Sequence, residues 1–134
     1  MIDKLIAQLK LHEGVKLKPY RCTAGKLTIG VGRNLDDVGI SMAEADLMLK
    51  NDIESVIRRC IGLTFWSELS ENRKIVLIDM VFNLGWTRFL GFKKTIDLIS
   101  KGKYEQASIE MLNSAWAKQV GYRAETLAKM MRQG

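Results

Sequence analysis

The chain has 134 residues, of which 47% are hydrophobic and 27% are charged, and its formal net charge is +6. This length and composition indicate one folding unit, or two lobes that share a core, and exclude a disordered chain. The positive charge suits a polyanionic partner, such as nucleic acid, anionic lipid or a bacterial wall. The alternative is a soluble surface that is basic without a specific partner.

Two cysteines, Cys22 and Cys60, stand in a chain without a disulfide-rich composition. We therefore expect two reduced thiols in a protein made in a cytosol. The N-terminal segment is too short and too charged for a secretion signal, and no run of residues approaches the length of a membrane span. We expect no stable insertion into a membrane.

Helical and strand patterns alternate in the first third of the chain. Apolar residues at helical spacing predict a helix over residues 3–12, with Asp3 as its N-cap and Gly14 as its end. Residues 15–35 combine an alternating pattern with Pro19 and several turn glycines. This pattern predicts a β-hairpin or a small three-stranded sheet.

Two longer helices are predicted next. Ser41 and Glu44 form a capping box that opens a helix to about Cys60. Ser70 caps a second helix, which Gly85 closes. This second helix is apolar nearly all round, so we expect it to be the buried centre of the domain.

The remaining pattern predicts four shorter helices, at about 92–101, 104–113, 115–119 and 122–132. The predicted fold class is therefore α+β and mainly helical, in a single domain over residues 1–134. A small β lobe occupies about residues 14–38, and the helical part comprises residues 1–13 and 39–134. We expect the first helix to pack into the helical part.

Glu13 is the leading candidate for chemistry. It ends the first predicted helix, where the helix dipole disfavours a negative charge. A carboxylic acid that stays protonated is the group that cleavage of a glycosidic bond needs. A helix-end Glu taken alone is more often an exposed residue without a role.

The residues after Glu13 give it a context. Eight residues separate Glu13 from Cys22 and five separate Cys22 from Thr28, which opens the sequence T-I-G-V-G. This spacing resembles the active-site region of phage endolysins of the T-even-phage lysozyme type, glycoside hydrolase family 24. Their motif is Glu, eight residues, Asp or Cys, five residues, Thr. The resemblance covers nearly the whole chain and is weakest between residues 36 and 70, where this chain is shorter than the longest family members.

The resemblance implies catalytic roles for three residues. Glu13 would protonate the leaving oxygen, and the Thr28 hydroxyl would hold the attacking water. Cys22 occupies the place where the family more often has Asp. Its thiol would act as a base only if neighbours such as Lys26 or Arg21 lowered its pKa, and it could otherwise orient the water.

The resemblance also implies supporting residues. Arg123 would pair with Glu13, although a solvated helix arginine is the simpler interpretation. Arg33 would pair with Asp52 as a structural tie. Trp116 is most simply a core aromatic, and Asn83, which would bind an N-acetyl group, fits a core helix equally well. The residues implied to bind substrate are Gly32, Met80, Phe82, Asn83 and Leu84.

The implied fold is lysozyme-like, with a small β-hairpin lobe and a helical lobe. The implied activity is hydrolysis of the β-1,4 bond between N-acetylmuramic acid and N-acetylglucosamine in peptidoglycan, which lyses a phage-infected host. We expect a monomer without cofactor or metal and without a specific nucleic-acid partner. It would wait in the host cytoplasm for holin-dependent release to the periplasm and wall.

Two alternatives remain open at the level of the sequence. A lytic transglycosylase would act on the same substrate with one acid/base Glu and tolerates the loss of Asp. A non-catalytic wall-binding or DNA-binding module would use the positive charge alone, but no helix-turn-helix or aromatic–basic pattern supports it.

Overall fold

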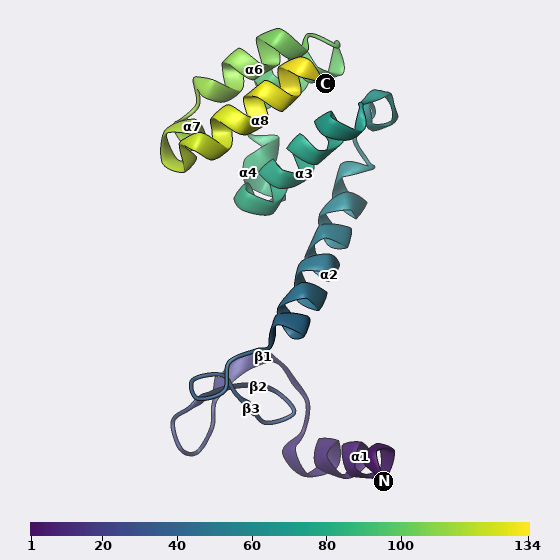
Figure 1. Ribbon diagram of the computed structural model, residues 1–134, viewed down its shortest axis with the longest axis vertical. Coiled ribbons are helices and arrows are strands. Elements are labelled where there is room, and N and C mark those ends of the chain that lie inside the picture. Colours follow the sequence, from purple (N-terminus) through teal and green to yellow (C-terminus); the bar gives the residue numbers. More distant parts are fainter. The chain divides into compact units, whose positions relative to one another are not determined.

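The computed structural model describes all residues from 1 to 134. Eight α-helices, one 3-10 helix and a three-stranded antiparallel sheet make up the chain (Figure 1). The mainly helical α+β class is therefore confirmed. The chain divides into two compact units, Met1–Met48 and Leu49–Gly134, and each is described by itself. None of the helices is both long enough and apolar enough to cross a membrane.

Helix α1 spans Ile2–Glu13 and opens the first unit. The predicted N-cap is wrong, because Met1 is the N-cap and Asp3 lies in the first turn of the helix. The predicted end is confirmed: Gly14 has φ +73° and donates its N–H to the Lys10 carbonyl at 2.9 Å. Glycine suits this position because it adopts positive φ without a Cβ penalty.

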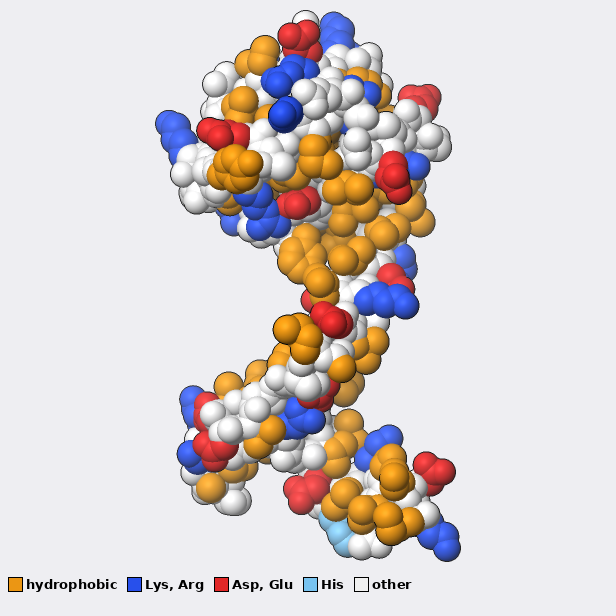
Figure 2. Space-filling view, viewed as in Figure 1, with side chains coloured by type: hydrophobic (Ala, Val, Ile, Leu, Met, Phe, Trp, Pro, Cys, Tyr) orange, Lys and Arg blue, Asp and Glu red, His pale blue; other side chains and the backbone are white.

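The apolar residues of α1 remain at the surface of the first unit. No residue of this helix is buried, and Figure 2 shows its hydrophobic side chains gathered on the surface. The exposed fractions of Ile2, Leu5, Ile6 and Leu9 lie between 40% and 64%. The expected packing of the first helix into the helical part stays a prediction.

The sheet consists of β1 (Lys16–Arg21), β2 (Leu27–Gly30) and β3 (Arg33–Asn34), in that order. Tyr20 pairs with Thr28 between β1 and β2, and Thr28 pairs with Asn34 between β2 and β3. Thr28 is the one buried residue of the first unit, with 3% of its surface exposed. The predicted three-stranded sheet is thus confirmed, and its middle strand carries a candidate catalytic residue.

Residues 22–26 join β1 to β2, and a hydrogen bond between Cys22 and Lys26 leaves three residues, 23–25, in the turn. The Gly25 N–H donates to the Cys22 carbonyl at 2.8 Å, and the Cys22 N–H donates to the Lys26 carbonyl at 2.9 Å. Gly25 has φ +76°. A turn followed by a glycine with positive φ is a common closure for three-residue hairpins.

Helix α2 spans Met42–Cys60, and the predicted capping box opens it. The Glu44 N–H donates to the Ser41 hydroxyl at 3.1 Å, and the Ser41 N–H donates to the Glu44 carboxylate at 2.9 Å. Arg33 also binds this carboxylate, with both terminal nitrogens at 2.8 Å from its oxygens. The expected partner of Arg33 was Asp52, and the structure instead pairs it with Glu44.

The second unit contains the end of α2 and all later helices. Ser70 caps α3 by accepting the Arg73 N–H at 3.2 Å, as predicted, and Ser114 caps α7 in the same way. The sequence pattern missed α4 and the 3-10 helix η1, both of which are very short. The elements are η1 (Trp66–Glu68), α3 (Glu71–Leu84), α4 (Trp86–Leu90), α5 (Lys93–Ser100), α6 (Tyr104–Leu112), α7 (Ala115–Val120) and α8 (Tyr122–Gln133).

Helix α3 contributes most to the core of this unit. Val76, Leu77 and Met80 have no exposed surface, and α3 packs against α4 and α8. Helices α6 and α8 lie side by side, as Figure 1 shows. The prediction that α3 is the buried centre of the domain is only partly right, because Ile75 and Phe82 are each 44% exposed.

Candidate active site

The Glu13 carboxylate lies against the turn between β2 and β3. A Cβ atom built on Gly32 would stand 3.0 Å from Glu13 Oε2 and 3.3 Å from Glu13 Cδ. Both distances are tighter than nine in ten real Cβ contacts, so a side chain at position 32 would press against the Glu13 carboxylate. The fold therefore brings the end of α1 and the T-I-G-V-G turn together.

Cys22 lies in the loop between β1 and β2, and Thr28 lies in β2, the middle strand of the sheet. Thr28 is buried and donates its hydroxyl to the Lys26 carbonyl at 2.8 Å. That carbonyl also accepts the Cys22 N–H. Since a hydroxyl carries one proton and two lone pairs, Thr28 keeps acceptor capacity for a second partner, such as a water.

The environment of Cys22 lowers the pKa of its thiol below the ordinary value. The largest cause is a hydrogen bond with the backbone of Lys26, followed by one with the backbone of Ala24, and the Thr28 side chain makes a smaller contribution. The neighbour Lys26 thus lowers this pKa through its backbone, whereas the charged side chains of Lys26 and Arg21 have other partners. Lys26 pairs with Asp37 at 3.1 Å, and Arg21 pairs with Asp36 at 3.8 Å.

The second thiol, Cys60, differs from Cys22 in burial and in the direction of its pKa shift. Cys60 ends α2 and has no exposed surface, and burial raises its pKa to about 11. Both cysteines are free, as expected from the composition. Cys22 is thus the thiol with access to solvent and thiolate character, whereas Cys60 behaves as a small core residue.

Arg123, near the start of α8, has a partner that the sequence did not indicate. Its Nε and Nη2 atoms each lie 2.7 Å from Asp79 Oδ1 on α3. Both side chains are about half-buried. This ion pair links α3 to α8, and the pairing of Arg123 with Glu13 stays a prediction.

The residues of α3 that were expected to bind substrate fall into different environments. Met80 has no exposed surface, and Leu84 is also buried. Asn83 is exposed, and its Oδ1 accepts the Trp116 Nε1–H at 2.8 Å. Phe82 is exposed and lines a cavity of about 340 Å³ together with Ile75 and the Asp79–Arg123 pair.

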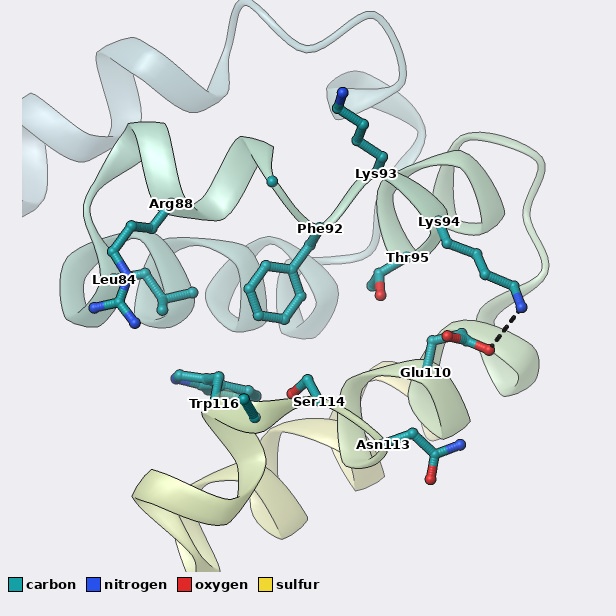
Figure 3. Close-up of a pocket in the computed structure, with 12 residues that line it drawn as sticks. Leu84, Arg88, Phe92, Lys93, Lys94, Thr95, Glu110, Asn113, Ser114 and Trp116 are labelled. Atoms are coloured by element: carbon teal, nitrogen blue, oxygen red, sulfur yellow. Dashed lines mark ion pairs between the residues drawn. The ribbon is translucent and has the colours of Figure 1, made fainter.

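A larger cavity, of about 470 Å³, lies beside Trp116 (Figure 3). Phe92 contacts Trp116 edge to face, with 6.1 Å between ring centroids, and Trp116 is buried as expected. Lys94 on the cavity wall is paired with Glu110 at 3.1 Å. Arg88 and Lys93 also line the cavity and have no ion-pair partner. The cavity therefore combines an aromatic wall with positive charge.

The phage lysozyme family model matches residues 10–133. The chain belongs to the phage lysozyme family. This range includes Glu13, Cys22, Thr28 and Arg123. The predicted membership is confirmed, and with it a lysozyme-type glycosidase activity toward peptidoglycan.

Similar members of the phage lysozyme family come from different sources. "Probable T4-type lysozyme 2" of Dictyostelium discoideum is 30% identical over 164 residues, which include 100% of this chain and 96% of the relative. "Probable T4-type lysozyme 1" of the same organism is 28% identical over 165 residues, with the same coverage. An "Endolysin" of Acyrthosiphon pisum secondary endosymbiont phage 1 is 33% identical over 128 residues, with 90% of this chain and 84% of the relative covered.

This phage lysozyme family member is short within the aligned region. The alignment with the first relative extends over 164 residues, whereas the chain has 134. We expected the shortening between residues 36 and 70. At the start of that region, a connection of only seven residues, 35–41, joins β3 to α2, and the Arg33–Glu44 ion pair spans it.

The sequence interpretation missed three structural features, one in the first unit and two in the second. The contact between Glu13 and Gly32, the Asp79–Arg123 pair and the cavity beside Trp116 each join segments that lie far apart in the chain. Only the glycines of T-I-G-V-G gave a signal, because a glycine after a strand often marks a close approach of another group.

Proposed function

We propose that this phage lysozyme family member is an endolysin that hydrolyses the β-1,4 bond between N-acetylmuramic acid and N-acetylglucosamine, with Glu13 as the general acid. The observation that carries the proposal is the position of the Glu13 carboxylate, which lies against the β2–β3 turn of the sheet that also holds Thr28 in β2 and Cys22 in the β1–β2 loop. Membership of the family supports the class of substrate.

In the proposed reaction Glu13 donates its proton to the glycosidic oxygen as the bond from that oxygen to the sugar C1 breaks. Positive charge develops on C1, and a water attacks it from the opposite face. The water loses a proton, and both products leave with their hydroxyl groups complete. Solvent then returns a proton to Glu13.

Thr28 and Cys22 are the proposed partners of the attacking water. The Thr28 hydroxyl donates to the Lys26 carbonyl, so it would meet the water as an acceptor. The lowered pKa of Cys22 increases the fraction of its thiol present as thiolate, the form that can accept the water proton. Both residues belong to one hairpin, β1–β2, which favours a fixed direction of attack.

The proposed contacts with the polysaccharide involve exposed residues. Phe82 and Asn83 are the candidates on α3. We propose no substrate contact for Met80 or Leu84, since both are buried. Arg123 is the proposed electrostatic partner of Glu13, with Asp79 as its neighbour on α3.

The proposed biological role is lysis of the host at the end of phage infection. The protein would accumulate as a monomer in the host cytoplasm and reach the periplasm and wall through a holin lesion. The net charge of +6 favours binding to the anionic wall.

Digestion of purified peptidoglycan tests the proposal. Wild-type protein should release fragments that end in reducing N-acetylmuramic acid, whereas a folded Glu13→Gln variant should release none. Mass spectrometry of borohydride-reduced products identifies the sugar at each new end. Binding to the wall without release of any fragment would contradict an enzymatic role and favour a binding module.

A second candidate function follows from Cys22. Position 22 holds a thiol where a carboxylate would serve as the second catalytic group of a hydrolase. A lytic transglycosylase needs only the acid/base Glu13, because the C6 hydroxyl of the muramic acid attacks C1 in place of water. Anhydro-muramic acid ends in the same digest would establish this reaction instead of hydrolysis.

A further inference from the structure

We propose that Gly32 is a positioning residue for Glu13: the missing side chain at position 32 creates the space in which the carboxylate is held. The inference rests on the proposed function, because it takes Glu13 as the acid. It replaces the expected contact of Gly32 with the substrate by a contact with the catalytic group.

The geometry is specific to one face of the turn. A Cβ on Gly32 would lie 3.0, 3.3 and 3.5 Å from three successive side-chain atoms of Glu13, namely Oε2, Cδ and Cγ. No other residue stands among the three nearest atoms. The outer part of the Glu13 side chain, from Cγ to Oε2, therefore packs against the α-carbon of Gly32.

The steric contact of an added methyl group is with the side chain of Glu13 and not with backbone atoms. The closest atoms belong to the far end of a flexible side chain, which can shift by a rotation about its own bonds. The carboxylate would move away from the turn by a few tenths of an ångström or adopt another rotamer. General acid catalysis depends on the distance from the proton donor to the leaving oxygen, so such a shift changes the rate.

Backbone strain is a separate effect of the same substitution, and the chain offers a control for it. Gly32 has φ +68° and Gly39 has φ +64°, so an alanine at either position is strained by a similar amount. A Cβ on Gly39 would meet no atom within 4 Å. Both glycines lie in the first unit, and Gly39 has no part in the proposed chemistry.

The experiment compares Gly32→Ala with Gly39→Ala in wall digestion and in thermal unfolding. We expect similar losses of Tm in the two variants. We expect kcat to fall about 10- to 100-fold in Gly32→Ala and to stay within about twofold in Gly39→Ala. The apparent KM for wall fragments should not change in either variant, because the substrate contacts remain.

Different results would overturn the inference. Equal kcat in the two variants would show that the contact with Glu13 does not matter for the reaction. A rise in KM at constant kcat would assign Gly32 to substrate binding, as the sequence suggested. Sedimentation with intact walls in the inactive Glu13→Gln background checks this point directly, since a positioning role predicts unchanged binding.

Two further measurements keep the test decisive. If Gly32→Ala does not fold, Gly32→Asn places the same Cβ on a residue that tolerates positive φ. The NMR chemical shift of the Glu13 side-chain carboxyl carbon reports on its surroundings without any activity. It should change in Gly32→Ala and not in Gly39→Ala. An inactive wild-type protein with this NMR result would refute the proposed function and leave the contact intact, whereas an active protein without it would refute the inference alone.

Discussion

Glu13 combines two local constraints: it is the last residue of α1, and its side chain lies over a glycine turn. Glu13→Gln keeps the size of the side chain and removes the proton donor. We expect wall hydrolysis to fall by about 10²- to 10⁴-fold with little change in Tm. Turbidity of permeabilised cells and thermal unfolding measure the two effects. Full activity of a folded variant would sink the proposed mechanism.

Cys22 offers a test of what the second group does. Cys22→Asp places a carboxylate, ionised near neutral pH, where the backbone of Lys26 and Ala24 already favours an anion. We therefore expect retained or increased activity for Cys22→Asp and partial activity for Cys22→Ser. Initial rates of wall digestion give the comparison. If Cys22→Ser and alkylated wild-type protein are both fully active, the thiol is a bystander.

Replacing Thr28 is expected to affect both activity and stability. Its hydroxyl is buried and satisfies the Lys26 carbonyl, so Thr28→Ala loses a hydrogen bond worth about 0.5–1.5 kcal/mol as well as the water partner. We expect a large loss of activity together with a modest loss of Tm. Thr28→Ser keeps the hydroxyl and should recover most of the activity. Activity that follows Tm alone in both variants would assign Thr28 to the sheet.

The connection between β3 and α2 gives the first unit a dependence on pH. Arg33 and the capping-box contacts with Ser41 lower the pKa of Glu44 from 4.5 to about 2. A carboxyl whose pKa is lower in the folded state stabilises the fold above its unfolded value. This contribution is complete above about pH 4.5 and disappears as the pH falls towards 2.

Glu44→Gln should therefore destabilise the protein at pH 7 and have a much smaller effect near pH 2. Urea unfolding at a series of pH values measures the difference from wild type. Glu54→Gln, on the exposed face of the same helix and without an ion pair, is the control and should have little effect at any pH. A difference that is constant with pH would mean that the Arg33–Glu44 pair contributes nothing.

The elements that the sequence predicted are those with local signals at their ends. Ser41 with Glu44, Ser70 and Gly14 each form hydrogen bonds within a few residues, so their patterns predict the structure directly. Helix α4 has five residues and no side-chain cap, and it was missed. Its formation depends on the packing of Phe89, which is buried against other segments, and such packing leaves no periodic pattern in a short segment.

The candidate site was predictable in composition and not in contacts. The spacing of Glu13, Cys22 and Thr28 identified the family, and the hairpin does bring the last two together. The partner of Arg123 was not predictable, because Asp79 lies 44 residues earlier in an apolar helix. The same holds for Ile75 and Phe82, which look like core residues by composition and lie at the surface of their unit.

The distribution of charge predicts how the protein responds to salt. Arg88 and Lys93 supply the unpaired cations of the cavity beside Trp116. Replacing both with alanine should weaken binding to the wall and reduce the dependence of binding on ionic strength. Sedimentation with purified walls at several salt concentrations, in the Glu13→Gln background, measures both effects.

The matched control removes the same charge elsewhere. Lys129 and Arg132 lie on α8, away from this cavity, and their side chains form no ion pair. The alanine double variant at these positions should bind the wall more tightly than the Arg88–Lys93 variant. Equal binding by the two variants would mean that only net charge matters and that the cavity has no special part.

The contrast between the two thiols makes the unmodified chain suitable for single-site spectroscopy. A maleimide dye reacts with thiolate, which Cys22 forms more readily because its pKa is lowered, whereas Cys60 is buried and has a pKa of about 11. One fluorophore would then sit on the hairpin beside Thr28 without any cysteine replacement. Its emission would report the binding of wall fragments to the Glu13→Gln protein in real time, with the label attached to a residue of the candidate site itself.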